Sequence, residues 1–246
     1  MPDHLSTRGR TVPSCARRAD RAVRLRQAGA GGSKKPRESD IPFYGVLMRS
    51  VPAWALVSSG CAPVFLIMGW LVASSLQGHP YDPAAQTISV LAAPGHSGSW
   101  VMTAAFIALG VCHLLTAWGL RPAATAGRMA LAAGGLSALA VAVVPAPSSG
   151  GSLSHGSVAA AGFAVLAAWP VLAARAGTAV PWALRPFPSL GATAVMAVGA
   201  AWFLVELHLH GVAGVAERAV TTLQSVWPFV VVLSCLRGSL RDACPS

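Results

Sequence analysis

Six long apolar runs constrain the fold of this chain more than any other feature of its sequence. Each run is about 18–25 residues long, and a helix of that length crosses the roughly 30 Å hydrocarbon core of a bilayer. The runs cover about 52–77, 100–120, 129–146, 157–174, 189–209 and 219–236. Glu206 is the single formal charge inside them. The pattern predicts an all-α fold, a polytopic transmembrane bundle of six helices.

The composition excludes most soluble classes of protein for the bulk of the chain. Apolar residues make up 54% of it and charged residues only 11%, whereas an average soluble domain contains about 25% charged residues. Such a chain cannot cover a water-facing surface with charge. A soluble enzyme, a coiled coil and a disordered regulator are therefore excluded.

The chain begins with a polar segment, residues 1–47, which is rich in Gly, Ser and Arg and lacks apolar periodicity. This composition predicts a disordered basic tail. Because Met48 and Arg49 directly precede the first apolar run, an over-extended start is the alternative. Residues 48–240 then form the six-helix domain and residues 241–246 a short second tail. The basic residues of the first fifty positions are Arg8, Arg10, Arg17, Arg18, Arg21, Arg24, Arg26, Lys34, Lys35, Arg37 and Arg49.

The partners that this charge favours are lipids. The net charge of +10 could suggest nucleic-acid binding, but the tail has no aromatic residue before Phe43 and no recognisable nucleic-acid motif. A basic tail beside an anionic leaflet explains the charge more simply. We therefore expect contacts with the lipid bilayer, and with anionic lipids at the tail, and no nucleic-acid partner. Self-association into a homo-oligomer is left open.

Basic residues alternate between successive loops. Residues 78–99 and 147–156 contain no Lys or Arg, whereas 121–128 and 175–188 contain two Arg each. Because cytoplasmic loops are enriched in Lys and Arg, the alternation predicts a multi-pass plasma-membrane protein with both termini in the cytoplasm. The first, third and fifth loops would then face outside.

The first outer loop is the most distinctive stretch of the sequence. Asp82 followed by Pro83 is a favourable helix start, with Asp as the N-cap and Pro at the first helical position. Pro94 and Gly95 would end the segment. Because about ten residues are too few to span a bilayer, we predict a short interfacial helix here.

This loop also carries a family resemblance. Residues 81–95 follow the pattern YDPxxQTISxLAAPG, and an apolar helix follows that contains Gly110 and ends in Trp-Gly-Leu-Arg at 118–121. The chain thereby resembles the domain of unknown function 998 family of bacterial and archaeal membrane proteins, over residues 55–240. Other positions that look like this family are His155, Glu217, Arg218 and Trp227. The resemblance implies six helices and transfers no biochemical activity.

Glu206 is the main candidate for a functional residue in this sequence. It lies about one turn inside the outer end of the fifth run, where an ionisable group is costly and usually faces the bundle interior or water. His210 is four residues further on and shares its helical face. The pair could ligate a metal or relay a proton. The alternative is a structural carboxylate that bonds to a neighbouring helix or reaches the headgroups.

We predict that Glu206 and His210 join Asp82 and His155 in a polar cluster at the outer face. Asp82 follows the first helix and His155 lies where the fourth helix enters from outside, so all four share one level of the bundle. These four are the catalytic candidates, and Glu206 and His210 are the metal candidates. A fifth polar residue, His113, lies within the second run, and we expect its imidazole to be buried and hydrogen-bonded.

The activity is left open among three classes. The first is a non-enzymatic membrane protein that packs lipid or a partner helix, and this is the interpretation we favour. The second is a carrier of a small or lipophilic molecule, and the third is an outer-face hydrolase or transferase that uses His and acidic groups. Nucleophile motifs and phosphate loops are absent from the sequence, and nothing in it predicts a cofactor. A continuous polar cavity open to one face would favour the second class, and converging His, Asp and Glu side chains around a small pocket the third. A solid core packed with Ala and Gly would favour the first.

Overall fold

The computed structural model describes residues 51–78, 81–147 and 151–243 and is all-helical in these ranges. The predicted basic tail, residues 1–47, lies outside the described residues. The long helices are α3 (Ala53–Ser75), α5 (Ser99–Gly119), α6 (Thr125–Val143), α7 (Leu153–Ala173), α8 (Pro186–Leu209) and α9 (Ala213–Ala243). Two short elements accompany them, α4 (Ile88–Leu91) and the 3₁₀-helix η2 (Trp182–Leu184). All six long helices are long and apolar enough to cross a membrane, so the predicted six-helix bundle is confirmed.

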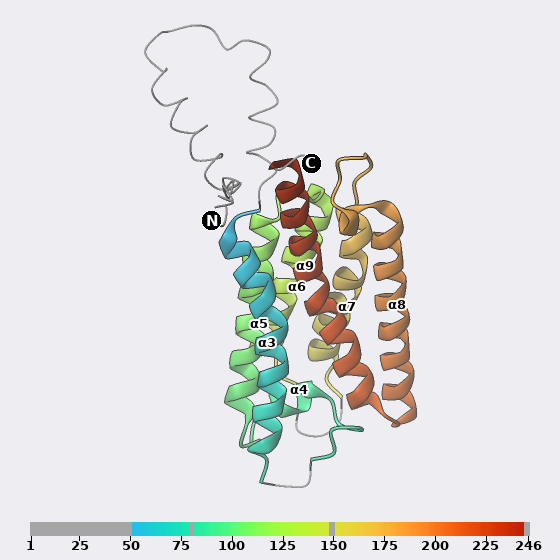
Figure 1. Ribbon diagram of the computed structural model, residues 1–246. Helices are drawn as coiled ribbons and strands as arrows, with labels where there is room; N and C mark the ends of the chain where they lie inside the picture. The colour runs from blue at the N-terminus through green and yellow to red at the C-terminus, as the bar shows by residue number, and fades with distance from the viewer. Residues whose placement is uncertain (1–50, 79–80, 148–150, 244–246) are drawn as a thin grey trace, which may run out of the picture.

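The helices run antiparallel in chain order and close on themselves (Figure 1). Each long helix packs against the next one along the chain, and α9 returns to pack against α3. Helix α8 has the least burial of the six and contacts mainly α7 and α9. It therefore covers the outside of the bundle, and the other five helices surround the interior.

The two ends of the bundle differ. At one end, which we call the α4 end, α4 packs against α3, α5 and α9 (Figure 1). At the opposite end the interior is filled by fully buried side chains, among them Trp169, Leu131 and Leu184. This end is a close-packed apolar core.

Small residues bring α5 and α6 into backbone contact. A Cβ atom added to Gly110 would lie 2.7 Å from the carbonyl oxygen of Gly135, and one added to Gly135 would lie 2.8 Å from that of Gly110. Neither position has room for a side chain. The two glycines thus allow the backbones of α5 and α6 to approach each other closely.

Prolines lie inside three of the spanning helices, at Pro63 in α3, Pro170 in α7 and Pro228 in α9. The helices continue through them, as is common in membranes, where neighbouring helices satisfy the freed backbone groups.

The short helix of the first loop is present, but it begins later than predicted. Asp82 does not cap a helix. Its Oδ1 instead accepts a hydrogen bond from the Ala84 N–H at 2.8 Å, which forms a local turn. The chain is extended at Thr87, and α4 starts at Ile88. Ile88 and Leu91 are buried in the bundle.

Candidate functional site

Residues 81–91, which we call the docked segment, are held against the start of α9 by Arg218. The Arg218 guanidinium donates to the carbonyl oxygens of Pro83 at 2.7 Å and Gln86 at 3.1 Å, and also to the Tyr81 hydroxyl. It lies 5.9 Å from the ring centroid of Trp70 and 5.8 Å from that of Tyr81. These are distances at which a cation is attracted to an aromatic face. One arginine thus connects α3, the docked segment and α9.

Tyr81 completes this connection. Its hydroxyl donates to the carbonyl oxygens of Gln86 and Thr87 at 3.2 and 3.3 Å. Burial raises the pKa of Tyr81 above its ordinary value, and the positive charge of Arg218 acts in the opposite direction. The phenol is therefore neutral at pH 7 and keeps its proton for donation.

Gly214 makes the close approach of α9 to the docked segment possible. A Cβ atom at this position would lie 2.3 Å from the Gln86 carbonyl oxygen and 2.5 Å from that of Pro83. The neighbouring Val215 N–H donates to the Ala84 carbonyl at 3.2 Å. Any side chain on Gly214 would separate these backbones.

Glu217 holds the other half of the docked segment. Its Oε2 accepts from the Ile88 N–H and its Oε1 accepts from the Ser89 hydroxyl at 3.1 Å. The residue is only 3% exposed. Both oxygens act as acceptors. Among the described residues no basic side chain forms an ion pair with it, because Arg218 directs its guanidinium to carbonyl groups and to Tyr81.

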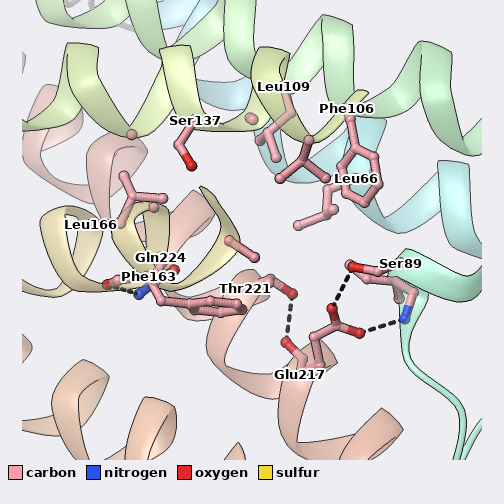
Figure 2. Close-up of a pocket in the computed structure, with 16 residues that line it drawn as sticks. Leu66, Ser89, Phe106, Leu109, Ser137, Phe163, Leu166, Glu217, Thr221 and Gln224 are labelled. Carbon is pink, nitrogen blue, oxygen red and sulfur yellow. Dashed lines mark hydrogen bonds between the residues drawn. The ribbon is translucent and has the colours of Figure 1, made fainter. Parts of the chain in front are cut away.

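A cavity lies beside Glu217, inside the α4 half of the bundle (Figure 2). Its volume is about 80 Å³, whereas a single water needs roughly 10–15 Å³. Its walls are mainly apolar and come from α3, α4, α5, α6, α7 and α9. The apolar lining includes Leu66, Phe106, Leu109, Val141, Phe163 and Leu166.

The polar lining consists of Glu217, Ser89, Thr221, Gln224 and Ser137. Its hydrogen-bond donors are already engaged within the protein. The Ser89 hydroxyl donates to Glu217, and the Thr221 hydroxyl donates to the Glu217 backbone carbonyl at 2.7 Å. The Ser137 hydroxyl donates to the Val158 carbonyl at 2.8 Å, and the Gln224 amide to that of Phe163 at 3.1 Å. What the polar lining can still offer a bound molecule is mostly lone pairs.

The structure places the predicted site residues of α8 away from this cavity. The Glu206 Oε1 accepts from the Trp202 indole at 3.1 Å, and its Oε2 accepts from the Val212 N–H at 2.9 Å. The carboxylate thereby closes the turn between α8 and α9. His210 ends α8 in a left-handed conformation with φ of 55° and is exposed. No residue of α8 lines the cavity, because α8 lies outside the five helices that surround it.

Asp82 and His155 are likewise bonded to their own neighbourhoods. Asp82 is exposed and stabilises the turn at Ala84. The His155 Nδ1 bonds to the Val144 carbonyl at 2.8 Å and so connects the start of α7 to the end of α6. Across the described ranges no hydrogen bond or ion pair joins any two of the four candidates, and no group of three His, Cys, Asp or Glu could hold a metal ion. The structure does not bring the four together.

His113 is buried in α5, as expected, but the hydrogen bond predicted for it is not seen at one nitrogen. Its side chain is 1% exposed, and its Nδ1 has no hydrogen-bond partner among the described residues. The residue does not line the cavity.

The spacing of polar residues in the sequence indicates the cavity residues, although the clustering of ionisable residues does not. Glu217, Thr221 and Gln224 are spaced four and three residues apart, which places them on one face of a helix. The sixth apolar run was predicted to begin at about 219, and this left Glu217 in a turn. In the structure α9 begins at Ala213, so all three residues lie inside the helix.

The six long apolar helices define an integral membrane protein. The chain matches the family model described as "Protein of unknown function (DUF998)" over residues 60–234. It belongs to the DUF998 family, as the motif in the first loop indicated. No curated protein and no solved structure matches it. The two family-like parts of the sequence, the loop motif and the Glu217–Arg218 pair, are in direct contact.

Proposed function

We propose that this protein binds and carries a small, largely apolar molecule in the cavity beside Glu217. The observation behind the proposal is the cavity itself, a space of about 80 Å³ with mainly apolar walls and polar side chains spread along it. The close-packed core at the opposite end supports binding, rather than open conduction, in this conformation.

The cavity is mainly apolar and is not the continuous polar cavity expected of a carrier, but its presence counts against a solid core packed with Ala and Gly. A protein that only packs lipid or a partner helix has no need for a cavity bordered by a buried carboxylate. An outer-face hydrolase or transferase would need its His and acidic groups to converge. Asp82, His155 and Glu206 instead bond to groups outside this set, and His210 is exposed. Catalytic or metal-binding roles for them stay predictions. The carrier class is therefore the one that the geometry favours.

Photolabelling can test this proposal. In lipid nanodiscs, 1-hexanol with a diazirine on its chain should label cavity residues such as Phe106 and Phe163 saturably, and unlabelled 1-hexanol should compete. Ala138 lines the cavity, so Ala138→Phe should fill it and reduce that labelling by about tenfold, the effect of roughly 1.4 kcal/mol of binding free energy. Labelled positions are mapped by mass spectrometry.

A matched control is available on the same helix. Ala133 is exposed on α6, so Ala133→Phe should leave cavity labelling unchanged. If labelling is restricted to outward-facing residues, or is equal in both variants, the cavity is not a binding site.

We further propose that the protein lies in the plasma membrane, with the α4 end outside and both termini in the cytoplasm. The arginine alternation supports this orientation.

In a cysteine-free background, Gly151→Cys should react with a membrane-impermeant thiol reagent on whole cells, and Thr178→Cys should react only after permeabilisation. The reverse pattern would overturn the orientation. Contact of the basic tail with anionic lipids belongs to the same proposal.

A further inference from the structure

We infer that the molecule held in the cavity is a lipophilic ammonium ion, whose N–H groups hydrogen-bond to Glu217. The inference rests on the proposed function and specifies the chemistry of its ligand. It combines three features of the site: the unpaired carboxylate, the remaining hydrogen-bonding capacity of the lining, and the apolar walls.

The carboxylate of Glu217 is the first feature. It is buried within a helix that is apolar enough to span a membrane, and among the described residues it has hydrogen bonds but no ion pair. A buried charge is costly unless it is paired. The Ile88 N–H and the Ser89 hydroxyl use two of the roughly four lone-pair positions of a carboxylate, and the Ser89 backbone N–H and the charge of Arg218 also act on it. A bound cation would use the others and neutralise the charge.

The second feature is the shortage of free donors in the lining. Ser89, Thr221 and Ser137 each direct their hydroxyl proton to an acceptor within the protein. Their lone pairs remain, as do those of Glu217. A ligand that only accepts hydrogen bonds, such as a carboxylate or a phosphate, would find few donors here and would lie beside the acceptor oxygens of Glu217. A ligand that donates finds several acceptors.

The apolar walls determine the rest of the ligand. Leu66, Leu109 and Leu166 provide an aliphatic surface, and Phe106 and Phe163 add aromatic rings. Figure 2 shows these side chains around the space that Glu217 borders from one side. Aromatic faces also attract cations when the site is dry. The complementary molecule has a protonated amine at one end and a short hydrocarbon body.

Competition against the same diazirine-bearing 1-hexanol tests the inference. Hexylammonium, 1-hexanol and hexanoate have similar hydrocarbon bodies and differ in the charge and donors of their heads. At equal concentration in the membrane, hexylammonium should compete at least about tenfold better than 1-hexanol, and hexanoate should compete least. Glu217→Gln should abolish the preference for the amine and retain labelling by the alcohol probe.

Glu206→Gln is the matched control, because Glu206 lies at the same end of the bundle but outside the cavity lining. It should retain the amine preference. Equal competition by the amine and the alcohol in the unaltered protein would overturn the inference, whether or not Glu217→Gln folds. If millimolar Na⁺ abolishes amine competition without affecting the alcohol, Glu217 holds a metal cation and the inference is wrong. Absence of cavity labelling by the probe would instead contradict the proposed function.

Discussion

Replacing Gly135 with leucine is expected to destabilise the bundle more than any other single substitution considered for this chain. The Cβ atom alone would lie 2.8 Å from the Gly110 carbonyl oxygen and 3.1 Å from the His113 Cβ. Because backbone cannot move aside as a flexible side chain can, α5 and α6 must separate. Overpacking costs about 1–3 kcal/mol and occasionally more. A loss of about 3 kcal/mol in the free energy of unfolding would lower the melting temperature by about 6–12 °C.

The measurement is the melting temperature of the purified protein in detergent, together with its yield from the membrane. Gly191→Leu is the control, since a side chain at Gly191 in α8 meets no atom within 4 Å. It should melt close to the unaltered protein. Equal melting of the two variants would show that the contact between α5 and α6 is not tight.

Replacing Arg218 with methionine is expected to release the docked segment while the six helices stay assembled. The change removes the hydrogen bonds to Pro83, Gln86 and Tyr81 and the charge over two aromatic rings. Hydrogen bonds to a charged group are worth about 1.5–3 kcal/mol each. Losing even one would favour opening of the segment by about 10- to 100-fold.

Amide hydrogen exchange measures that opening directly. Peptides that cover residues 83–91 should exchange about 10- to 100-fold faster in Arg218→Met, while peptides from the middle of α5 should not change. Arg121→Ala removes an exposed arginine at the opposite end and should leave the docked segment protected. Unchanged exchange in Arg218→Met would mean that Glu217 and Gly214 hold the segment without it.

In the first loop, tertiary contacts prevented the helix start that the local sequence predicts. Asp82–Pro83 is a good helix start by local chemistry, and a helix from that point would form its own backbone hydrogen bonds. In the structure Arg218 and the Val215 N–H bind the carbonyl oxygens of Pro83, Ala84 and Gln86 instead. Those partners come from more than a hundred residues away, so no local pattern could indicate them.

The predicted polar cluster failed for a different reason. Glu206, His155 and Asp82 were placed at the correct end of the bundle, because helix order and length determine depth. Their lateral positions depend on which helices surround the interior. Helix α8 lies on the outside, so Glu206 bonds to Trp202 and Val212 and not to the residues around the cavity.

By itself the sequence determined the class of protein, the number of spanning helices and the family. These properties follow from hydropathy, run length and a loop motif, which are all local features of the chain. Only the tertiary structure decided that Glu217, Thr221 and Gln224 face a shared cavity, and that α8 does not. The rotation and neighbours of each helix depend on packing contacts among all the helices of the bundle. The sequence of a single segment therefore does not determine them.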